Sequence, residues 1–355
     1  MLSRIARADK IILSLASLIA ITVVVALASR GVFAFRIDSV TSNLGLYASC
    51  ILMYLAYRVG RIMIVERPED LTQAVLDQEF SAEKRRSFMR ALPVLLALAL
   101  FMPIFSTIKS NIELFQEYSW DLNFVELDRT IHGTDPWRIL QPILGFPIVS
   151  SILAFLYQVW LLLIYAGGTF FAFYHRDQIL RQRYFTAYFL IWSINGMLLA
   201  IMLASVGPCF LEPLLGRDDF MPLMSYLNEA NRQYPVAVVD IQQALLDWHF
   251  TNDQGLGRGI TAMPSMHVSM AFLFYMAMRH VSPLAGKIFG AFFLIILVSS
   301  VHLGFHYAVD GYVSILTTAI IWKACGWFAS RTAEDSDGMA QQQPTVTEDQ
   351  APALA

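Results

Sequence analysis

Three residues that lie far apart in the sequence could together carry out nucleophilic and acid–base chemistry. His267 lies in "AMPSMHVSMAF", and His306 and Asp310 lie in "SVHLGFHYAVDG". In a helix, side chains four residues apart are neighbours on one face, about 6 Å apart along the axis. Asp310 could then accept a proton from one imidazole nitrogen of His306 and leave the other nitrogen free to attack. His267 could supply the proton for a leaving group, in a triad whose nucleophile is a histidine.

The residues before the first of these histidines have features of a phosphate-binding site. Pro264 suits the first position of a helix, where its missing N–H costs nothing. The free N–H groups of Ser265 and its successors would then bind an anion at the helix N-terminus. Arg258 lies just upstream in "GLGRGI" and could hold phosphoryl oxygens. His302 lies one helical turn before the proposed nucleophile and is also predicted to contact phosphate or substrate.

Membrane helices must position these residues, because the composition does not fit a soluble enzyme. The 355 residues are 56% hydrophobic and 15% charged, with a mean hydropathy of +0.53, whereas soluble domains carry about 25% charged residues. A helix that crosses a membrane needs about 20 mostly apolar residues. We therefore predict an all-α, polytopic membrane bundle of about eight spans. The predicted spans are 11–29, 41–60, 89–108, 149–173, 185–206, 264–280, 287–304 and 307–328.

The distribution of Lys and Arg predicts the orientation of the bundle. These residues gather before the first predicted span and in the short segments between spans two and three, four and five, and six and seven. Cytoplasmic loops carry such positive charge, so both termini are expected in the cytoplasm. Loops 109–148 and 207–263 then face outward, and the histidines lie near the outer boundary. The sequence has no Asn-x-Ser/Thr motif, which favours a bacterial inner membrane.

The chain divides into three predicted parts. Residues 1–88 form a two-span extension with a basic cytoplasmic loop, and 89–330 form a six-span catalytic core. Residues 331–355 are rich in Gln, Pro, Asp and Glu, which predicts a disordered cytoplasmic tail.

The outer loops are expected to cover the site. The first one predicts an amphipathic helix followed by a proline-rich interfacial stretch, which could form a lid. Its acidic residues are interpreted as solvated loop charges, as are two in the second loop. These residues are Asp121, Asp128, Asp135, Asp218 and Asp219.

The pair of motifs "AMPSMHV" and "GFHYAVDG" resembles the type 2 phosphatidic acid phosphatase superfamily, and within it the inositol phosphorylceramide synthase-like (inositolphosphotransferase) branch. "SVGPCF", before the second outer loop, is similar to that branch as well. The resemblance covers about 89–330 and implies a core of six membrane helices. It also implies that His306 becomes phosphorylated, that Asp310 orients it, and that His267 protonates the leaving group.

The sequence departs from the phosphatase pattern in its basic residues. Ser300 stands where that pattern has an arginine, six residues before the nucleophilic histidine. The pattern also has a lysine followed seven residues later by Arg-Pro. Arg176 and Arg183 have nearly this spacing, but Tyr184 replaces the proline and the pair is predicted to lie on the cytoplasmic side. Both departures favour the transferase branch over a plain phosphatase.

The resemblance implies a phospholipid donor and a lipid acceptor of the ceramide or diacylglycerol type, with no cofactor. With water as the acceptor, the same residues would make a lipid phosphate phosphatase. A proton-coupled transporter is the alternative from a different class, but it predicts ionisable residues near mid-membrane in repeated halves. The net charge of −3 excludes nucleic-acid binding through bulk positive charge. His302 and His306 have a spacing that could bind a metal, but we predict no metal site because only one such pair occurs.

Overall fold

The computed structural model describes residues 2–32, 37–251 and 259–342, with side chains described between residues 7 and 333 of these ranges. Within them, every regular element is a helix, as the hydropathy pattern predicts. Seven of the described helical stretches are long and apolar enough to cross a membrane. The chain is therefore a multi-pass membrane protein, and the predicted all-α fold is confirmed.

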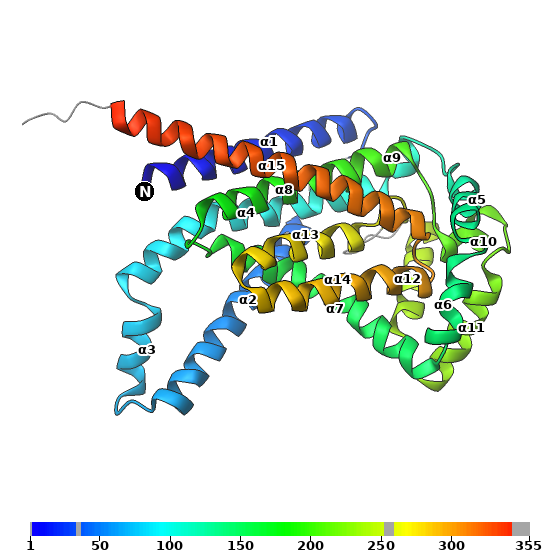
Figure 1. The fold of residues 1–355 in the computed structure, drawn as a ribbon, viewed down its shortest axis with the longest axis horizontal. Coiled ribbons are helices and arrows are strands. Elements are labelled where there is room, and N and C mark those ends of the chain that lie inside the picture. The colour runs from blue at the N-terminus through cyan, green and yellow to red at the C-terminus, as the bar shows by residue number, and fades with distance from the viewer. Residues whose placement is uncertain (1, 33–36, 252–258, 343–355) are drawn as a thin grey trace, which may run out of the picture.

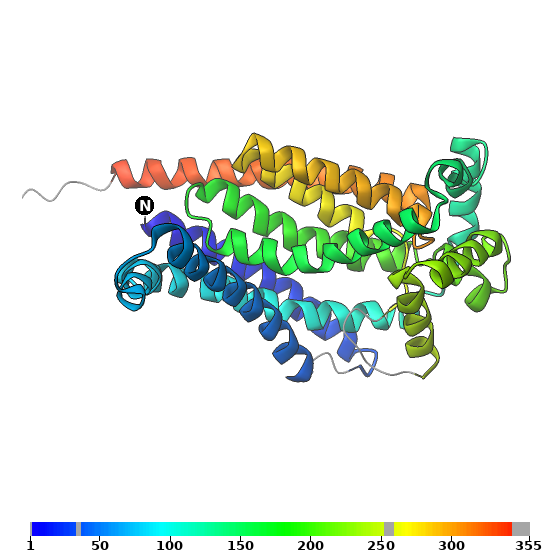
Figure 2. The ribbon, with the colours of Figure 1, turned by 90° about the horizontal axis from the view of Figure 1, so that it is seen from below.

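The membrane helices run along the long axis of the molecule (Figure 1, Figure 2). Those that match the predicted spans are α1 (Leu2–Ala28), α2 (Ile37–Arg61), α4 (Ala82–Ser110), α7 (Pro147–Ala172), α8 (Gln178–Ser193), α13 (Met266–Val281), α14 (Pro283–His302) and α15 (Ala308–Gln342). A π-helical turn, η1 (Ile62–Glu66), extends α2. A second one, η3 (Ile194–Leu199), joins α8 to α9 (Ala200–Met202).

Helix α13 is shorter than each of the seven spanning stretches and is not one of them, because α8 continues through η3 and α9 to Met202. Its 16 residues span about 24 Å. The predicted span over 264–280 becomes helical only at Met266, because the Ser265 side chain caps the helix by accepting a hydrogen bond from the Val268 N–H. Residues 262–265 are buried, and α13 packs against α8, α14 and α15. A membrane protein tolerates non-helical backbone within the hydrocarbon layer where other parts of the protein surround that backbone.

The two ends of the bundle differ in construction. At one end, several short helices gather around the start of α15 (Figure 1). They are α5 (Asp121–His132), α6 (Pro136–Leu144), α10 (Leu211–Leu215), α11 (Met221–Gln233) and α12 (Ala237–Thr251), with the 3-10 turns η2 (Ile112–Leu114) and η4 (Pro208–Phe210). The N-terminus, α3 (Leu71–Glu79) and the last turns of α15 lie at the opposite end (Figure 1).

Helix α8 lies inside the bundle and fixes the core. It packs against α1, α13 and α15. Four aromatic residues in its middle turns, Tyr184, Phe185, Tyr188 and Phe189, are fully buried. Each of these aromatic side chains buries about 150–250 Å² of its surface, so together they dominate the local packing. Through η3 and α9, α8 leads to the "SVGPCF" segment.

The C-terminal part differs in extent from the predicted boundary. Helix α15 continues to Gln342, 12 residues beyond Ser330. Residues 343–355, the rest of the predicted tail, lie outside the described residues.

Candidate active site

The turn between α14 and α15 holds His306. Gly304 adopts a positive φ of 74°, a conformation that glycine adopts without steric cost. The N–H groups of Phe305 and His306 both donate to the carbonyl oxygen of Ser300, at 3.2 and 3.1 Å. Ser300 is 1% exposed. The residue that stands in place of the expected arginine thus closes this turn through its backbone.

His306 and Asp310 form the hydrogen-bonded pair that their spacing predicts. The distance from His306 Nδ1 to Asp310 Oδ2 is 3.1 Å. A carboxylate only accepts hydrogen bonds, so Nδ1 carries the proton and Nε2 keeps its lone pair. The same Asp310 oxygen accepts a hydrogen bond from the Tyr307 N–H at 3.1 Å, as an acidic side chain in a capping box does. Both residues are buried, with Asp310 completely so.

His267 is the second residue of α13 and faces this pair. Its ring centre lies 6.1 Å from that of His306. Two aromatic residues of α7 hold its ring, Tyr157 at 4.2 Å and Trp160 at 4.0 Å between ring centres. The hydroxyl of Tyr157 and the indole N–H of Trp160 are buried and have no hydrogen-bond partner among the described residues. Both side chains therefore pack their rings against His267 and leave a buried polar group unpaired.

Helix α5 fixes the turn that carries His306, which the sequence analysis missed. The Asp128 carboxylate accepts hydrogen bonds from the N–H groups of Ala308 and Val309, at 2.8 and 3.0 Å. The Asp121 carboxylate accepts one from the Tyr307 hydroxyl at 2.8 Å. The prediction that these aspartates are solvated is wrong, since Asp121 is 0% and Asp128 3% exposed. Burial raises the pKa of both carboxyl groups, although their hydrogen bonds partly offset this.

The other three acidic residues of the outer loops differ from one another. Asp135 is 5% exposed and pairs with Arg129 and Arg138, so it is not a solvated charge either. Asp219 pairs with Arg129 and Arg217. Asp218 is exposed, as predicted.

The segment 204–209, which contains "SVGP", joins the two histidine-bearing regions. The Ser205 carbonyl accepts a hydrogen bond from the Ala262 N–H at 3.0 Å, just before α13. The Cys209 N–H donates to the Gly304 carbonyl at 2.8 Å, just before His306. Gly207 has a φ of 90°, and a Cβ there would lie 2.6 Å from the Phe305 carbonyl oxygen. Only glycine allows these two backbones to approach so closely.

The start of α13 presents backbone N–H groups toward the site. Ser265 is the N-cap, with its hydroxyl oxygen 3.3 Å from the Val268 N–H that it accepts. The N–H groups of Met266 and His267 have no hydrogen-bond partner among the described residues. The start of α13 thus has unpaired backbone donors, and the Ser265 side chain caps the helix; the binding of an anion there stays a prediction. Arg258, the other predicted phosphate ligand, lies outside the described residues.

His302 faces a different set of side chains from His306. Its Nε2 lies 2.9 Å from the Ser150 hydroxyl on α7, and that hydroxyl lies 2.8 Å from the Tyr226 hydroxyl on α11. His302 Nδ1 is buried without a hydrogen-bond partner in the described part of the chain. The observed contacts connect α14 to α7 and α11, and no described contact links His302 to His306.

Lys109 is a basic residue near His267 that the sequence analysis did not identify. It lies one turn beyond Phe105 on the same face of α4. That face is directed at the start of α13, because a Cβ on Gly196 would lie 2.7 Å from Phe105 and 3.1 Å from Met266 Sδ. The charge of Lys109 also acts electrostatically on the His267 imidazole. Nothing in the local sequence of α4 signals this proximity.

The described residues contain no group of three or more His, Cys, Asp or Glu side chains that could hold a metal ion.

The comparisons with known proteins agree with this architecture. The family model described as the PAP2 superfamily matches residues 122–324, which include all three predicted catalytic residues. No curated protein and no solved structure matches the chain.

Proposed function

Because the chain belongs to the PAP2 superfamily, we propose that it moves a phospho-head group between membrane lipids through a phosphohistidine on His306. The observation that carries the proposal is the His306–Asp310 hydrogen bond of 3.1 Å with His267 facing it at 6.1 Å.

In the first half of the reaction, His306 Nε2 attacks the phosphorus of the donor lipid. A P–N bond forms, the P–O bond to the donor's lipid alcohol breaks, and protonated His267 gives its proton to the departing oxygen. The imidazole of His306 gains positive charge in this step. The Asp310 carboxylate stabilises that charge and keeps Nδ1 protonated.

In the second half, neutral His267 acts as the base. It takes the proton from the acceptor hydroxyl, whose oxygen attacks phosphorus and breaks the P–N bond. His267 is then protonated again and His306 is neutral, so the enzyme returns to its starting state. When the acceptor is a lipid hydroxyl, the reaction is a transfer, and when it is water, the reaction is phosphatase hydrolysis.

The phosphoryl oxygens need positive partners because the arginine of the phosphatase pattern is replaced by Ser300. We assign this task to the ammonium group of Lys109 and to the N–H groups of Met266 and His267. Electrostatic stabilisation of this kind is commonly the largest part of catalysis. Ser265, His302 and Arg258 remain predicted phosphate ligands.

A lipid acceptor is favoured over water by the helices that surround the site. Helix α5 holds the turn of His306 on one face and exposes Leu122, Leu127 and Ile131 on others. Apolar side chains on a surface helix suit the interface of a bilayer. We propose an acceptor of the ceramide or diacylglycerol type, as in the inositol phosphorylceramide synthase-like branch, and an active site on the extracytoplasmic side of a bacterial inner membrane.

The proposal is tested by trapping the intermediate. Purified full-length protein is mixed with a donor phospholipid labelled at phosphorus, quenched, and examined for a phosphoprotein that is labile in acid and stable in base. His306→Ala should abolish the label. Asp310→Asn should slow its formation, on the order of 10²–10⁴-fold.

His280→Ala is the matched control, because His280 lies exposed at the far end of the same helix as His267. It should label like the wild type. Analysis of the products with a lipid acceptor present distinguishes transfer, which gives a new labelled lipid, from hydrolysis, which releases the labelled phospho-head group in soluble form. Turnover that persists in His306→Ala would refute the phosphohistidine mechanism.

A further inference from the structure

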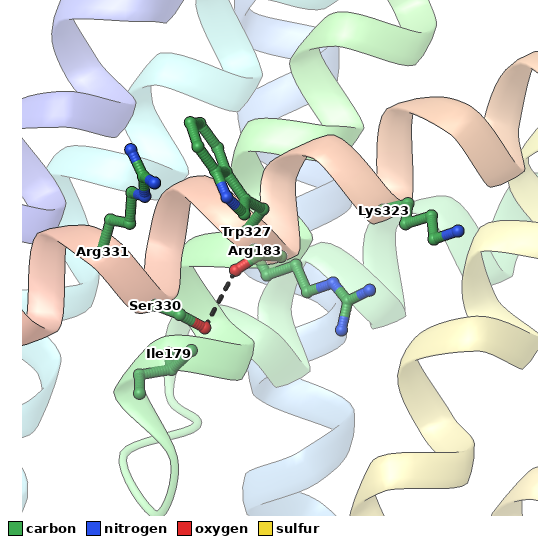
Figure 3. Close-up of a pocket in the computed structure, with 7 residues that line it drawn as sticks. Ile179, Arg183, Lys323, Trp327, Ser330 and Arg331 are labelled. Carbon is green, nitrogen blue, oxygen red and sulfur yellow. Dashed lines mark hydrogen bonds between the residues drawn. The ribbon is translucent and has the colours of Figure 1, made fainter.

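A second charged site lies between α8 and α15, at the end of the bundle opposite His306. It is a hollow of about 390 Å³ lined by Arg183, Lys323, Trp327, Ser330 and Arg331 among others (Figure 3). Lys323 and Arg331 follow Asp310 on α15 by 13 and 21 residues, or about 20 and 32 Å along the helix. The hollow is therefore near the opposite membrane surface from the histidines.

Arg183 is held in a fixed position in this hollow. Its Nε donates to the Trp322 carbonyl at 3.0 Å, and its guanidinium carbon lies 3.9 Å from the centre of the Trp322 ring. A Cβ on Gly326 would lie 2.6–2.9 Å from the guanidinium group, so the absence of a side chain at Gly326 makes room for it. A guanidinium has five N–H donors, and Nε is the only one of them with a hydrogen bond among the described residues. The others are available to an anion.

The hollow carries positive charge that no described carboxylate balances. The described ion pairs all lie elsewhere in the molecule. Lys323 is exposed beside Arg183, and the Arg331 guanidinium lies 4.1 Å over the Trp327 ring. Figure 3 shows Lys323 and Arg331 on either side of Trp327 and Arg183. The site suits a ligand with at least one phosphate.

The surroundings of the hollow select a lipid as that ligand. Trp327 is 60% and Phe328 43% exposed on α15, and Ile179 is 42% exposed on α8. Tryptophan is enriched where a helix leaves the bilayer, and basic pockets between membrane helices bind anionic head groups. A soluble phosphate compound would gain nothing from these apolar side chains.

We infer that the hollow between α8 and α15 binds the head group of an anionic phospholipid in the leaflet opposite the active site. The phosphate is bound by Arg183 and Lys323, and the acyl chains lie along Trp327 and Phe328. This inference does not depend on the proposed catalytic reaction.

Lipid binding to the purified full-length protein tests the inference. Native mass spectrometry compares phosphatidylglycerol with phosphatidylcholine of the same acyl chains. The wild type should prefer phosphatidylglycerol, and Lys323→Gln and Arg183→Gln should each weaken its binding about fivefold. Arg85→Gln/Arg86→Gln is the control pair, because both arginines are exposed on α4 at the same end of the bundle and lie outside the hollow.

If Arg183→Gln unfolds, Lys323→Gln alone still decides the test. Lys323 is exposed, so its replacement should not disturb the fold. Equal losses in Lys323→Gln and in the control pair would refute a specific site, as would a wild type without lipid preference. A competition arm adds inorganic phosphate. Full displacement of the lipid by inorganic phosphate would show a soluble-phosphate site instead.

Discussion

The carboxylate of Asp310 accepts a hydrogen bond from the His306 imidazole and another from the Tyr307 N–H. The same Asp310 oxygen thus orients the His306 ring and caps the N-terminus of α15. An asparagine would keep a single acceptor oxygen but could turn its NH₂ group toward His306, which would favour the wrong tautomer. The predicted slow labelling of Asp310→Asn follows from this change at a single atom.

Lys109→Met tests the assignment of the phosphate-binding cation. Methionine preserves length and apolar packing but removes the charge, so turnover should fall on the order of 10²-fold while the protein remains folded. Steady-state kinetics and a thermal unfolding measurement together check this expectation.

Lys287→Met is the control for this substitution. Lys287 is exposed near the start of α14, at the opposite end of the bundle, and its loss should leave turnover unchanged. If both variants keep full activity, Lys109 does not bind the phosphate.

Residue types and spacing were sufficient to predict that His267, His306 and Asp310 lie close together, whereas their catalytic roles stay predictions. Asp121 and Asp128 could not be predicted in the same way. Their partners, Tyr307 and Ala308, lie 186 and 180 residues away in the sequence, so only the tertiary fold reveals them. Lys109 has the same limitation, since its role depends on the packing of α4 against α13.

At the scale of elements, α5 connects the short helices at one end of the bundle to the turn that carries His306. Its inner face carries Asp121 and Asp128, which accept hydrogen bonds from the first residues of α15 and from Tyr307. Asp128 and Asp310 together satisfy N–H groups that a helix start leaves without partners. The position of His306 therefore depends on α5 as much as on α15.

Asp128→Asn should loosen the start of α15. Asparagine has only one acceptor oxygen, so the N–H groups of Ala308 and Val309 compete for it. Two charge-assisted hydrogen bonds are thus replaced by about one ordinary hydrogen bond, and we expect the free energy of unfolding to fall by about 1–3 kcal/mol. The rate of phosphoprotein formation should fall as well, because His306 is no longer held in place. Glu126→Gln, on the exposed face of α5, should change neither quantity, and equal behaviour of the two variants would contradict the role given to α5.

Gly207→Ala should be more damaging than Gly216→Ala. Both glycines have positive φ, but a Cβ on Gly207 would lie 2.6 Å from the Phe305 carbonyl oxygen, whereas nothing lies within 4 Å of one on Gly216. The backbone strain of alanine costs about 1–2 kcal/mol at a positive φ, and only Gly207→Ala must also push the turn of His306 away. Unfolding and labelling assays of the two variants check the difference, and equal effects would show that the contact is unimportant.

Hydropathy predicted which segments are membrane helices, because twenty apolar residues have few alternatives in a bilayer. It did not predict where α13 begins. That boundary depends on the Ser265 cap and on the hydrogen bond from Ala262 to Ser205, a contact between segments more than fifty residues apart. The amphipathic pattern of the first outer loop did predict a helix there, as α5 shows, but not its hydrogen bonds to the turn of His306.

In the whole molecule, the helical hairpins bring the N-terminus and the described end of α15 to one end and the start of α15 to the other (Figure 1). His306 directly precedes that start. The orientation of this arrangement in the membrane is a prediction from the positive charges. Cysteine labelling can test it with little background, because Cys50, Cys209 and Cys325 are buried.

A membrane-impermeant maleimide should label Asn123→Cys, on α5, in intact cells. It should label Glu83→Cys, at the start of α4, only after the membrane is permeabilised. Both positions are exposed, so accessibility to the reagent depends on the side of the membrane. The reverse pattern would put the histidines on the cytoplasmic side.

The shortness of α13 has a consequence for how a substrate arrives. A helix of 16 residues is about 6 Å shorter than the hydrocarbon layer of about 30 Å. If its Ser282 end reaches one boundary, His267 is submerged below the other. A lipid would then need only to diffuse laterally and move its phosphate group slightly inward, while its acyl chains stay in the hydrocarbon layer. At that depth bulk water is scarce, so a lipid alcohol that diffuses in the same leaflet would compete well with water for the phosphorylated histidine.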